Sequence, residues 1–295
     1  MALESISATD TVPMRGKSVF GFLISSPIIA GASLCLLLVI ASAILAPLLS
    51  PHNPMEMVPA LRLKPPSADY PLGTDAFGRD LLSRTLYGGR ISLLIGLGAA
   101  IISIVIGLAI GLVSGFFRWA DAIIMRVMDG LMAIPAILLA IAVVALSGAS
   151  LQTVLIAIII PEIPRVVRLV RSVVLTAREE PYVEAAIAMG TSLPKILWRH
   201  LMPNTFAPLI VQGTYVCASA ILTEAILSFL GAGISPETPT WGNIMAEGRS
   251  VFVIKPSLIF VPGFLLSIAI LSINLIGDAA RDALDPRMKQ REGGR

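Results

Sequence analysis

Long apolar runs that lack charge constrain this chain more than any other feature of its sequence. One run extends from about Pro27 to Leu49, and another extends from about Ile91 to Phe117. With a helical rise of about 1.5 Å per residue, each run is long enough to cross roughly 30 Å of hydrocarbon. Inside a bilayer only helices and closed barrels satisfy their own backbone hydrogen bonds. Runs of this length and composition therefore predict transmembrane helices.

The overall composition favours a membrane protein over a soluble one. The 295 residues are 56% hydrophobic and 14% charged, whereas soluble domains carry roughly 25% charged residues. A soluble fold of this length would leave too much apolar surface in contact with water. The net charge of +3 is modest and gives no reason to expect a nucleic-acid partner. The lipid bilayer is the expected environment.

Further apolar runs complete a prediction of six transmembrane helices, which makes the expected fold an all-α polytopic membrane protein. They cover approximately residues 122–146, 151–160, 206–230 and 258–276. Pro135 is expected to kink the third span, because proline removes a helical hydrogen bond. For the same reason, Pro161 and Pro164 are expected to interrupt the fourth span.

Charged side chains next to the third and fourth spans suggest specific pairings. Arg126 and Asp129 stand at i, i+3 spacing and are expected to pair with each other. Arg165, Arg168 and Arg171 recur at every third position and predict a basic stripe on a helix that leaves the bilayer. The stripe either holds that end in the cytoplasm or offers a contact for an acidic partner.

The distribution of positive charge predicts the orientation of the chain. Six spans place both termini on one side, and a cytoplasmic N-terminus assigns most of the 22 Lys and Arg residues to the cytoplasm. Because cytoplasmic loops carry the excess of Lys and Arg, the prediction is N-in and C-in. The expected organisation is a cytoplasmic segment (1–26), a first transmembrane helix (27–49), an extracytoplasmic loop with a short amphipathic helix (50–90), a core domain (91–277) with a cytoplasmic loop (175–205), and a cytoplasmic tail (278–295).

The cytoplasmic loop is expected to form a compact protrusion of two short helices. Pro181 suits the first turn of a helix, and Gly190 suits the left-handed residue that ends it. The second helix is expected to run from Leu193 to Leu201 and to stop at Pro203. The segment pairs no nucleophile with a base, so it is typical of a docking element, and no catalytic residue is expected.

The cysteines and histidines indicate neither a disulfide nor a metal site. Cys35 and Cys217 each lie within an apolar run and are expected to act as small apolar fillers. His52 and His200 have no neighbours at ligand spacing. No metal and no cofactor are therefore expected.

Several motifs resemble those of a known transporter family. Glu184-Ala185-Ala186, Gly190 and Leu201-Met202-Pro203 resemble the EAA loop of ABC importer permeases, although His200 and Met202 depart from the usual pattern. Residues 71–80, 224–231 and 282–287 resemble the second, C-type permease of the oligopeptide/dipeptide/nickel group. Together the matches extend over most of residues 15–290.

The resemblance implies a type I ABC importer permease in the bacterial inner membrane. Its expected partners are a second homologous permease subunit, two ATP-binding subunits and an extracytoplasmic substrate-binding protein. ATP hydrolysis would belong to the ATP-binding subunits, so this chain is not expected to be an enzyme. The residues that would couple the spans to the ATPase are Glu184, Ala185, Ala186, Gly190 and Pro203.

The sequence leaves the role of Glu224 and the identity of the substrate open. A carboxyl group inside a predicted span is expensive, so Glu224 either contacts substrate on the translocation path or takes part in a structural or gating pairing. Short peptides are the favoured substrate, with nickel or another small solute as the alternative. A secondary transporter or a membrane-embedded enzyme would be distinguished by the absence of a co-purifying P-loop ATPase.

Overall fold

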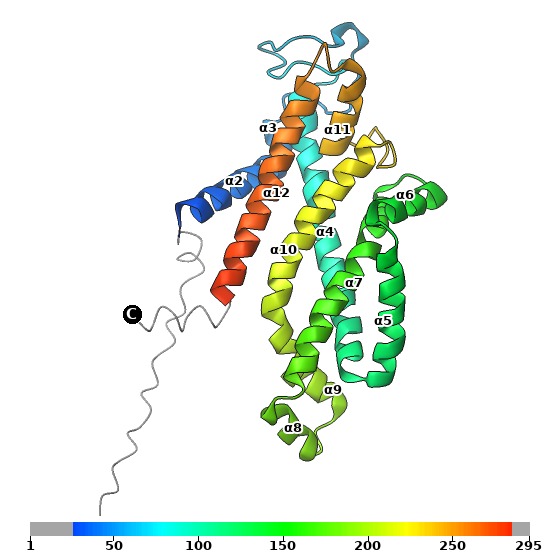
Figure 1. The fold of residues 1–295 in the computed structure, drawn as a ribbon. Helices are drawn as coiled ribbons and strands as arrows, with labels where there is room; N and C mark the ends of the chain where they lie inside the picture. Colours follow the sequence, from blue (N-terminus) through cyan, green and yellow to red (C-terminus); the bar gives the residue numbers. More distant parts are fainter. Residues whose placement is uncertain (1–25, 285–295) are drawn as a thin grey trace, which may run out of the picture.

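The structure is a computed structural model that describes residues 26–284, and this range is built from helices joined by loops (Figure 1). The predicted cytoplasmic segment lies outside the described residues except for Ser26, as does the tail from residue 285 onward. The long helices are α2 (Pro27–Ile44), α4 (Leu81–Phe116), α5 (Arg118–Ala133), α6 (Ala136–Ser147), α7 (Leu151–Ala177), α10 (Met202–Phe229) and α12 (Ser257–Leu284). The short elements are α3 (Ala46–Leu49), η1 (Pro59–Leu61), α8 (Pro181–Ala188), α9 (Leu193–Lys195), η2 (Ile196–Leu201), α11 (Trp241–Gly248) and η3 (Arg249–Val251).

The all-α prediction is confirmed for the described residues, and four or five of the helices are candidates to cross a membrane. By length and composition the candidates are α2, α4, α12 and the helical segment Leu193–Phe229. Helices α5 and α6 qualify only as a pair, and they are bent by 88° where a kink at Pro135 was expected. Helix α7 carries four charged residues and does not qualify by composition. The structure therefore supports a polytopic helical protein without establishing six spans.

Helix α4 begins earlier than the sequence suggested. Its 36 residues include the stretch near Leu81 that was expected to form a separate amphipathic surface helix. Asp80 caps the helix, because its carboxylate accepts a hydrogen bond from the backbone N–H of Ser83 at 2.9 Å. Leu81 is fully buried. The first turns of α4 therefore belong to the folded core, and the expectation of a surface helix was wrong.

Helix α7 continues through both of its prolines, so the expected interruption at Pro161 and Pro164 was also wrong. Close packing against α4 accounts for this, because three glycines of α4 let the two backbones approach. A Cβ added to any of these glycines would lie within 2.6 Å of a valine Cβ in α7. The glycine–valine pairs are Gly107 with Val166, Gly111 with Val170, and Gly115 with Val174.

Helix α4 runs along most of an elongated molecule, with distinct structures at the two ends (Figure 1). Helices α8 and α9 form one end, which we call the α8 end. The loop of residues 50–80 and helix α11 form the other, which we call the α11 end. Helices α5 and α6 lie beside α7, and α2 crosses α12. The fold thus separates a small helical protrusion from a looped cap by the length of α4.

Candidate functional site

The protrusion at the α8 end is held to the bundle by one face of α8. Val183 and Ala186 are buried, and Val183 packs in a cluster that includes Val174, Ile196 and Leu201. Glu184 and Ala185 are exposed on the rest of the helix. The spacing of buried and exposed residues follows one turn of helix, so a single apolar stripe fixes α8 and leaves its outer surface free.

Gly190 ends α8 as the sequence predicted. It adopts a φ of +76°, a conformation that favours glycine, and a Cβ added there would meet no neighbour. The backbone N–H of Thr191 donates to the carbonyl of Ala186 at 3.1 Å, and the N–H of Gly190 donates to Ile187 at 2.9 Å. This pattern closes the helix and turns the chain towards α9.

Pro203 does not stop the second short helix, contrary to expectation. A π-helical turn, η2, follows α9 directly and leads into α10. Pro203 lies in the first turn of α10, where a proline is tolerated because the N–H that it lacks has no α-helical partner there. The protrusion therefore groups Glu184, Ala185 and Ala186 on α8 with Gly190 just after its end, whereas Pro203 belongs to the long helix α10.

The outer surface of the protrusion combines exposed apolar side chains with exposed charges. Met189 is 79% exposed and Trp198 is 70% exposed. The same segment carries exposed charges, and within residues 26–284 none of them forms an ion pair. They are the acidic Glu179, Glu180 and Glu184 and the basic Lys195 and Arg199. Exposed apolar groups rimmed by charge are typical of a protein-binding surface.

Glu224 lies at a buried junction of three helices. Its side chain is fully buried and accepts hydrogen bonds from Ser228 at 2.8 Å and from Ser92 of α4 at 3.3 Å. The backbone N–H of Trp241, the first residue of α11, also donates to the Ser92 hydroxyl at 3.3 Å. Glu224 thereby connects α10 with α4 and, through Ser92, with α11.

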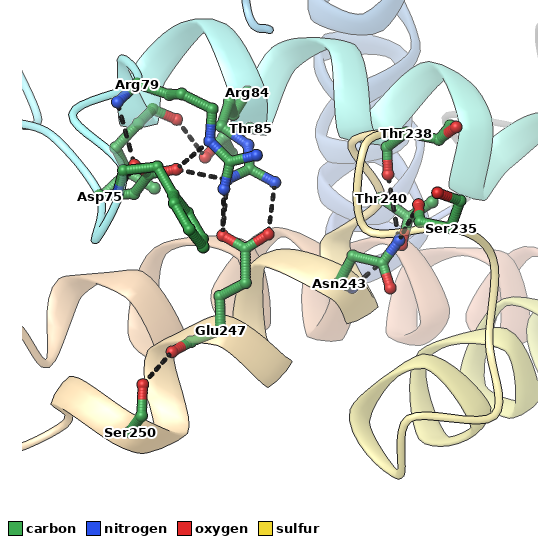
Figure 2. A network of polar contacts seen from close by, with 12 residues as sticks. Asp75, Arg79, Arg84, Thr85, Ser235, Thr238, Thr240, Asn243, Glu247 and Ser250 are labelled. Atoms are coloured by element: carbon green, nitrogen blue, oxygen red, sulfur yellow. Dashed lines mark hydrogen bonds and ion pairs between the residues drawn. The ribbon is translucent and has the colours of Figure 1, made fainter. Parts of the chain in front are cut away.

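A buried ionic cluster at the α11 end was not foreseen from the sequence (Figure 2). Both carboxylate oxygens of Glu247 in α11 accept hydrogen bonds from Arg84, at 2.6 and 2.9 Å, and one of them also accepts from Arg79 at 2.6 Å. Asp75 accepts from Arg79 Nε at 2.7 Å and also binds Arg84. The side chains of Asp75 and Arg84 are 0% and 1% exposed. We call these four residues the α11 clamp.

The α11 clamp ties residues 71–80, one of the stretches that carry the family resemblance, to a distant part of the chain. The charged residues in that stretch were a visible signal, but nothing in the sequence pointed to Glu247 as their partner. A second set of contacts fixes the loop before α11, because the Asn243 side-chain amide donates to three carbonyls (Figure 2). These belong to Ile234, Ser235 and Thr238.

The charges of α5 and α7 pair differently from the sequence prediction. Asp129 binds Arg168 at 2.6 Å and does not pair with Arg126, so that expectation was wrong. Here the side chain of Asp129 lies closer to an arginine of the adjacent helix α7 than to Arg126, one turn away on α5. The basic stripe is also paired within the chain. Arg165 binds Glu162 at 2.8 Å, and Arg171 binds Asp121 through both carboxylate oxygens.

Several long apolar helices packed together are typical of a polytopic membrane protein. A family described as "binding-protein-dependent transport system inner membrane component" matches residues 82–290. The chain belongs to this family. The resemblance read from the sequence and the predicted inner-membrane location are thereby confirmed. Membership of a transport family also agrees with the prediction that this chain is not itself an enzyme.

Curated relatives cover most of the chain. A probable peptide ABC transporter permease protein of Sinorhizobium fredii is 51% identical over 84% of this chain and 85% of its own length. The dipeptide transport system permease protein DppC of Alkalihalophilus pseudofirmus is 45% identical, over 84% of this chain and 82% of its own. The di/tripeptide transport system permease protein DppC of Pseudomonas aeruginosa is 42% identical over 88% of both chains.

One solved structure supports the fold. A chain of the inward-facing MetNI methionine ABC transporter aligns with a TM-score of 0.52 over 68% of this chain and 97% of that chain. The sequence identity is 20%, so this likeness concerns the fold alone.

Proposed function

We propose that this chain is a permease subunit of an ATP-driven importer of dipeptides and oligopeptides. The observation that carries the proposal is family membership combined with relatives at 42–51% identity that are named for peptide transport. A nickel importer of the same group is the alternative that the sequence left open. The peptide assignment is favoured because the relatives described above are named for peptide transport and share most of their length with this chain.

Six spans in an N-in, C-in orientation remain our proposal for the topology. Helix α7 would provide the remaining span, since it packs along α4 through the glycine–valine contacts and its charged residues are paired. The α8 end would then lie in the cytoplasm and the α11 end outside. A second permease subunit, two ATP-binding subunits and an extracytoplasmic binding protein would complete the importer.

The exposed surface of α8 would transmit the movement of the ATPase to the spans. Glu184 would face a basic group of an ATP-binding subunit, and the small Ala185 beside it would keep this face narrow enough to enter a cleft. Ala186 would hold α8 to the bundle, and Gly190 would end it. Val183 links α8 to the cluster that contains Val174 of α7 and Leu209 of α10. A rigid-body displacement of α8 would therefore move both helices and favour one of two packed states.

Glu224 would act in gating, through its hydrogen bonds, and not by direct contact with substrate. Its full burial and its bonds to Ser92 and Ser228 support this assignment over a position on the open path. A carboxyl group that joins three helices is sensitive to their relative movement, because any separation leaves a buried polar group without partners.

The experiment that tests the proposed function compares uptake of a labelled dipeptide with uptake of labelled nickel. Cells that lack this gene would be rescued with the wild-type protein or with Glu184→Ala. The expected result is loss of dipeptide uptake, rescue by the wild type and no rescue by the variant. Loss of nickel uptake alone would replace the substrate assignment. Unchanged uptake of both solutes would contradict it.

A further inference from the structure

Three ion pairs follow one side of α7, and their most exposed members are Asp129, Arg165 and Arg168. Arg171 with Asp121 lies nearest the α8 end, followed by Arg168 with Asp129 and then Arg165 with Glu162. The side chain of Asp129 is 57% exposed, that of Arg165 is 48% exposed and that of Arg168 is 43% exposed. The proposed coupling and gating roles make no use of these groups.

Contacts with α4 show that these charges lie at the depth of an apolar layer. Helix α4 carries no charged residue from Ile91 to Phe116, a stretch of about 39 Å at 1.5 Å per residue. Val166, the neighbour of Arg165, contacts Gly107 inside this stretch, about 13 Å from the end of α4. Val170, near Arg168, contacts Gly111 one turn closer to that end.

Asp129 is the most informative of these residues, because its side chain is too short to reach the membrane surface. It lies about 16 Å along α5 from Arg118, the first residue of that helix. A long arginine side chain can extend to the headgroups, but an aspartate at this depth needs water or protein beside it. An exposed carboxylate at this position therefore indicates that this face of α5 and α7 does not meet lipid.

We propose that Asp129, Arg168 and Arg165 line a water-filled part of the translocation path and bind solutes that carry both an ammonium and a carboxylate group. This inference rests on the proposed transport function. A zwitterionic solute would exchange partners with the existing ion pair: its ammonium group would bind Asp129 and its carboxylate would bind Arg168. Because ion pairs are exchanged and not lost, binding is weak enough for the solute to leave again.

Helix α10 contributes to the same site through Ser219, which donates a hydrogen bond to Glu162 of α7. This carboxylate accepts from Arg165 at 2.8 Å and from Ser219 of α10 at 2.9 Å, and its side chain is only 6% exposed. The paired and buried Glu162 fixes the direction of Arg165. Since α10 begins at the protrusion, a displacement of the α8 end would alter this contact and change the position of Arg165 in the path.

The first test measures whether water reaches the site in the assembled importer. In a background with Cys35 and Cys217 replaced by alanine, Asp129→Cys and Arg165→Cys would be treated with a membrane-impermeant, negatively charged methanethiosulfonate. Val127→Cys is the matched control, because Val127 is 54% exposed but lies on roughly the opposite face of α5. We expect modification at positions 129 and 165 at least tenfold faster than at 127.

Two outcomes would overturn the proposal. Equal, slow labelling at all three positions would show that no water reaches this face. Labelling in the isolated subunit but not in the assembled complex would show that the face contacts the second permease. Neither outcome would affect the dipeptide uptake experiment above, so failure of this site is distinguishable from failure of the proposed function.

The second test separates a solute site from a purely structural ion pair. Asp129→Asn and Arg168→Gln are each expected to lower dialanine uptake about tenfold while the complex assembles normally. The exchanged pair, Asp129→Arg with Arg168→Asp, would restore a structural ion pair but would present the charges in the reverse order. Continued loss of uptake in the exchanged pair supports the solute site, and full recovery would contradict it.

Discussion

The two ends of this molecule differ in whether their charged residues are buried and paired or exposed and unpaired within residues 26–284. At the α11 end, Asp75 and Arg84 are almost completely buried, and each is matched by an oppositely charged group of the α11 clamp. At the α8 end, Glu184, Lys195 and Arg199 are exposed and form no ion pair within residues 26–284.

This difference concerns how each end is stabilised. A buried cluster of charges fixes its own geometry, because separating any member leaves another buried without compensation. Exposed charges contribute little to stability until a partner removes them from water. The α11 end is therefore an internally fixed cap, whereas the charges of the α8 end remain exposed, as the proposed coupling surface requires.

The largest expected effect is the loss of stability on breaking the α11 clamp. Glu247→Ala would leave Arg79 and Arg84 buried with only Asp75 as a partner, and it should lower the free energy of unfolding by about 3–5 kcal/mol. Thermal unfolding in detergent and proteolysis of the 50–80 loop would measure this. Glu237→Ala is the control, since Glu237 is exposed at the same end. This variant should lower the free energy of unfolding by less than about 0.5 kcal/mol. Equal stability of the two variants would show that the clamp does not hold the cap.

A smaller effect is expected at the contact between α4 and α7, the helices that connect the two ends. Gly111→Ala would place a Cβ 2.6 Å from the Cβ of Val170, and forcing α4 and α7 apart should cost about 1–3 kcal/mol. Gly130→Ala is the matched control, because a Cβ there meets no atom within 4 Å. That variant should be stabilised by about 0.5–1 kcal/mol through the higher helix propensity of alanine. Similar unfolding temperatures for the two variants would argue against close contact between α4 and α7.

A local effect is expected where α8 ends. Gly190→Ala places a side chain at a φ of +76°, which should cost about 1–2 kcal/mol. Gly190→Asn should cost less, since asparagine tolerates the left-handed conformation better. Hydrogen exchange of the α8 amides would detect the loss, and protection in the α11 end should not change. A uniform loss across the molecule would contradict the view that the α8 end is independent of the cap.

The sequence predicted the features that depend on local composition, and it failed where distant residues meet. The uncharged stretch of α4 and the turn at Gly190 follow from residue type alone. The continuity of α7 through Pro164 depended on packing against α4, which a proline rule does not contain. Glu247 carried no local signal, because its importance comes from Arg79 and Arg84 far away in the chain. The misassigned partner of Asp129 has the same origin.

The most direct test of the account asks whether Glu184 is needed for coupling but not for folding. ATP hydrolysis and dipeptide uptake would be measured in the same proteoliposomes that contain the complete importer, with wild type, Glu184→Ala and the exposed control Glu56→Ala. We expect Glu184→Ala to change the unfolding free energy by less than about 0.5 kcal/mol. It should nevertheless abolish uptake while the complex still hydrolyses ATP, and Glu56→Ala should behave as the wild type. Normal uptake by Glu184→Ala, with the ATPase still bound, would contradict the assignment of the α8 end as the coupling surface.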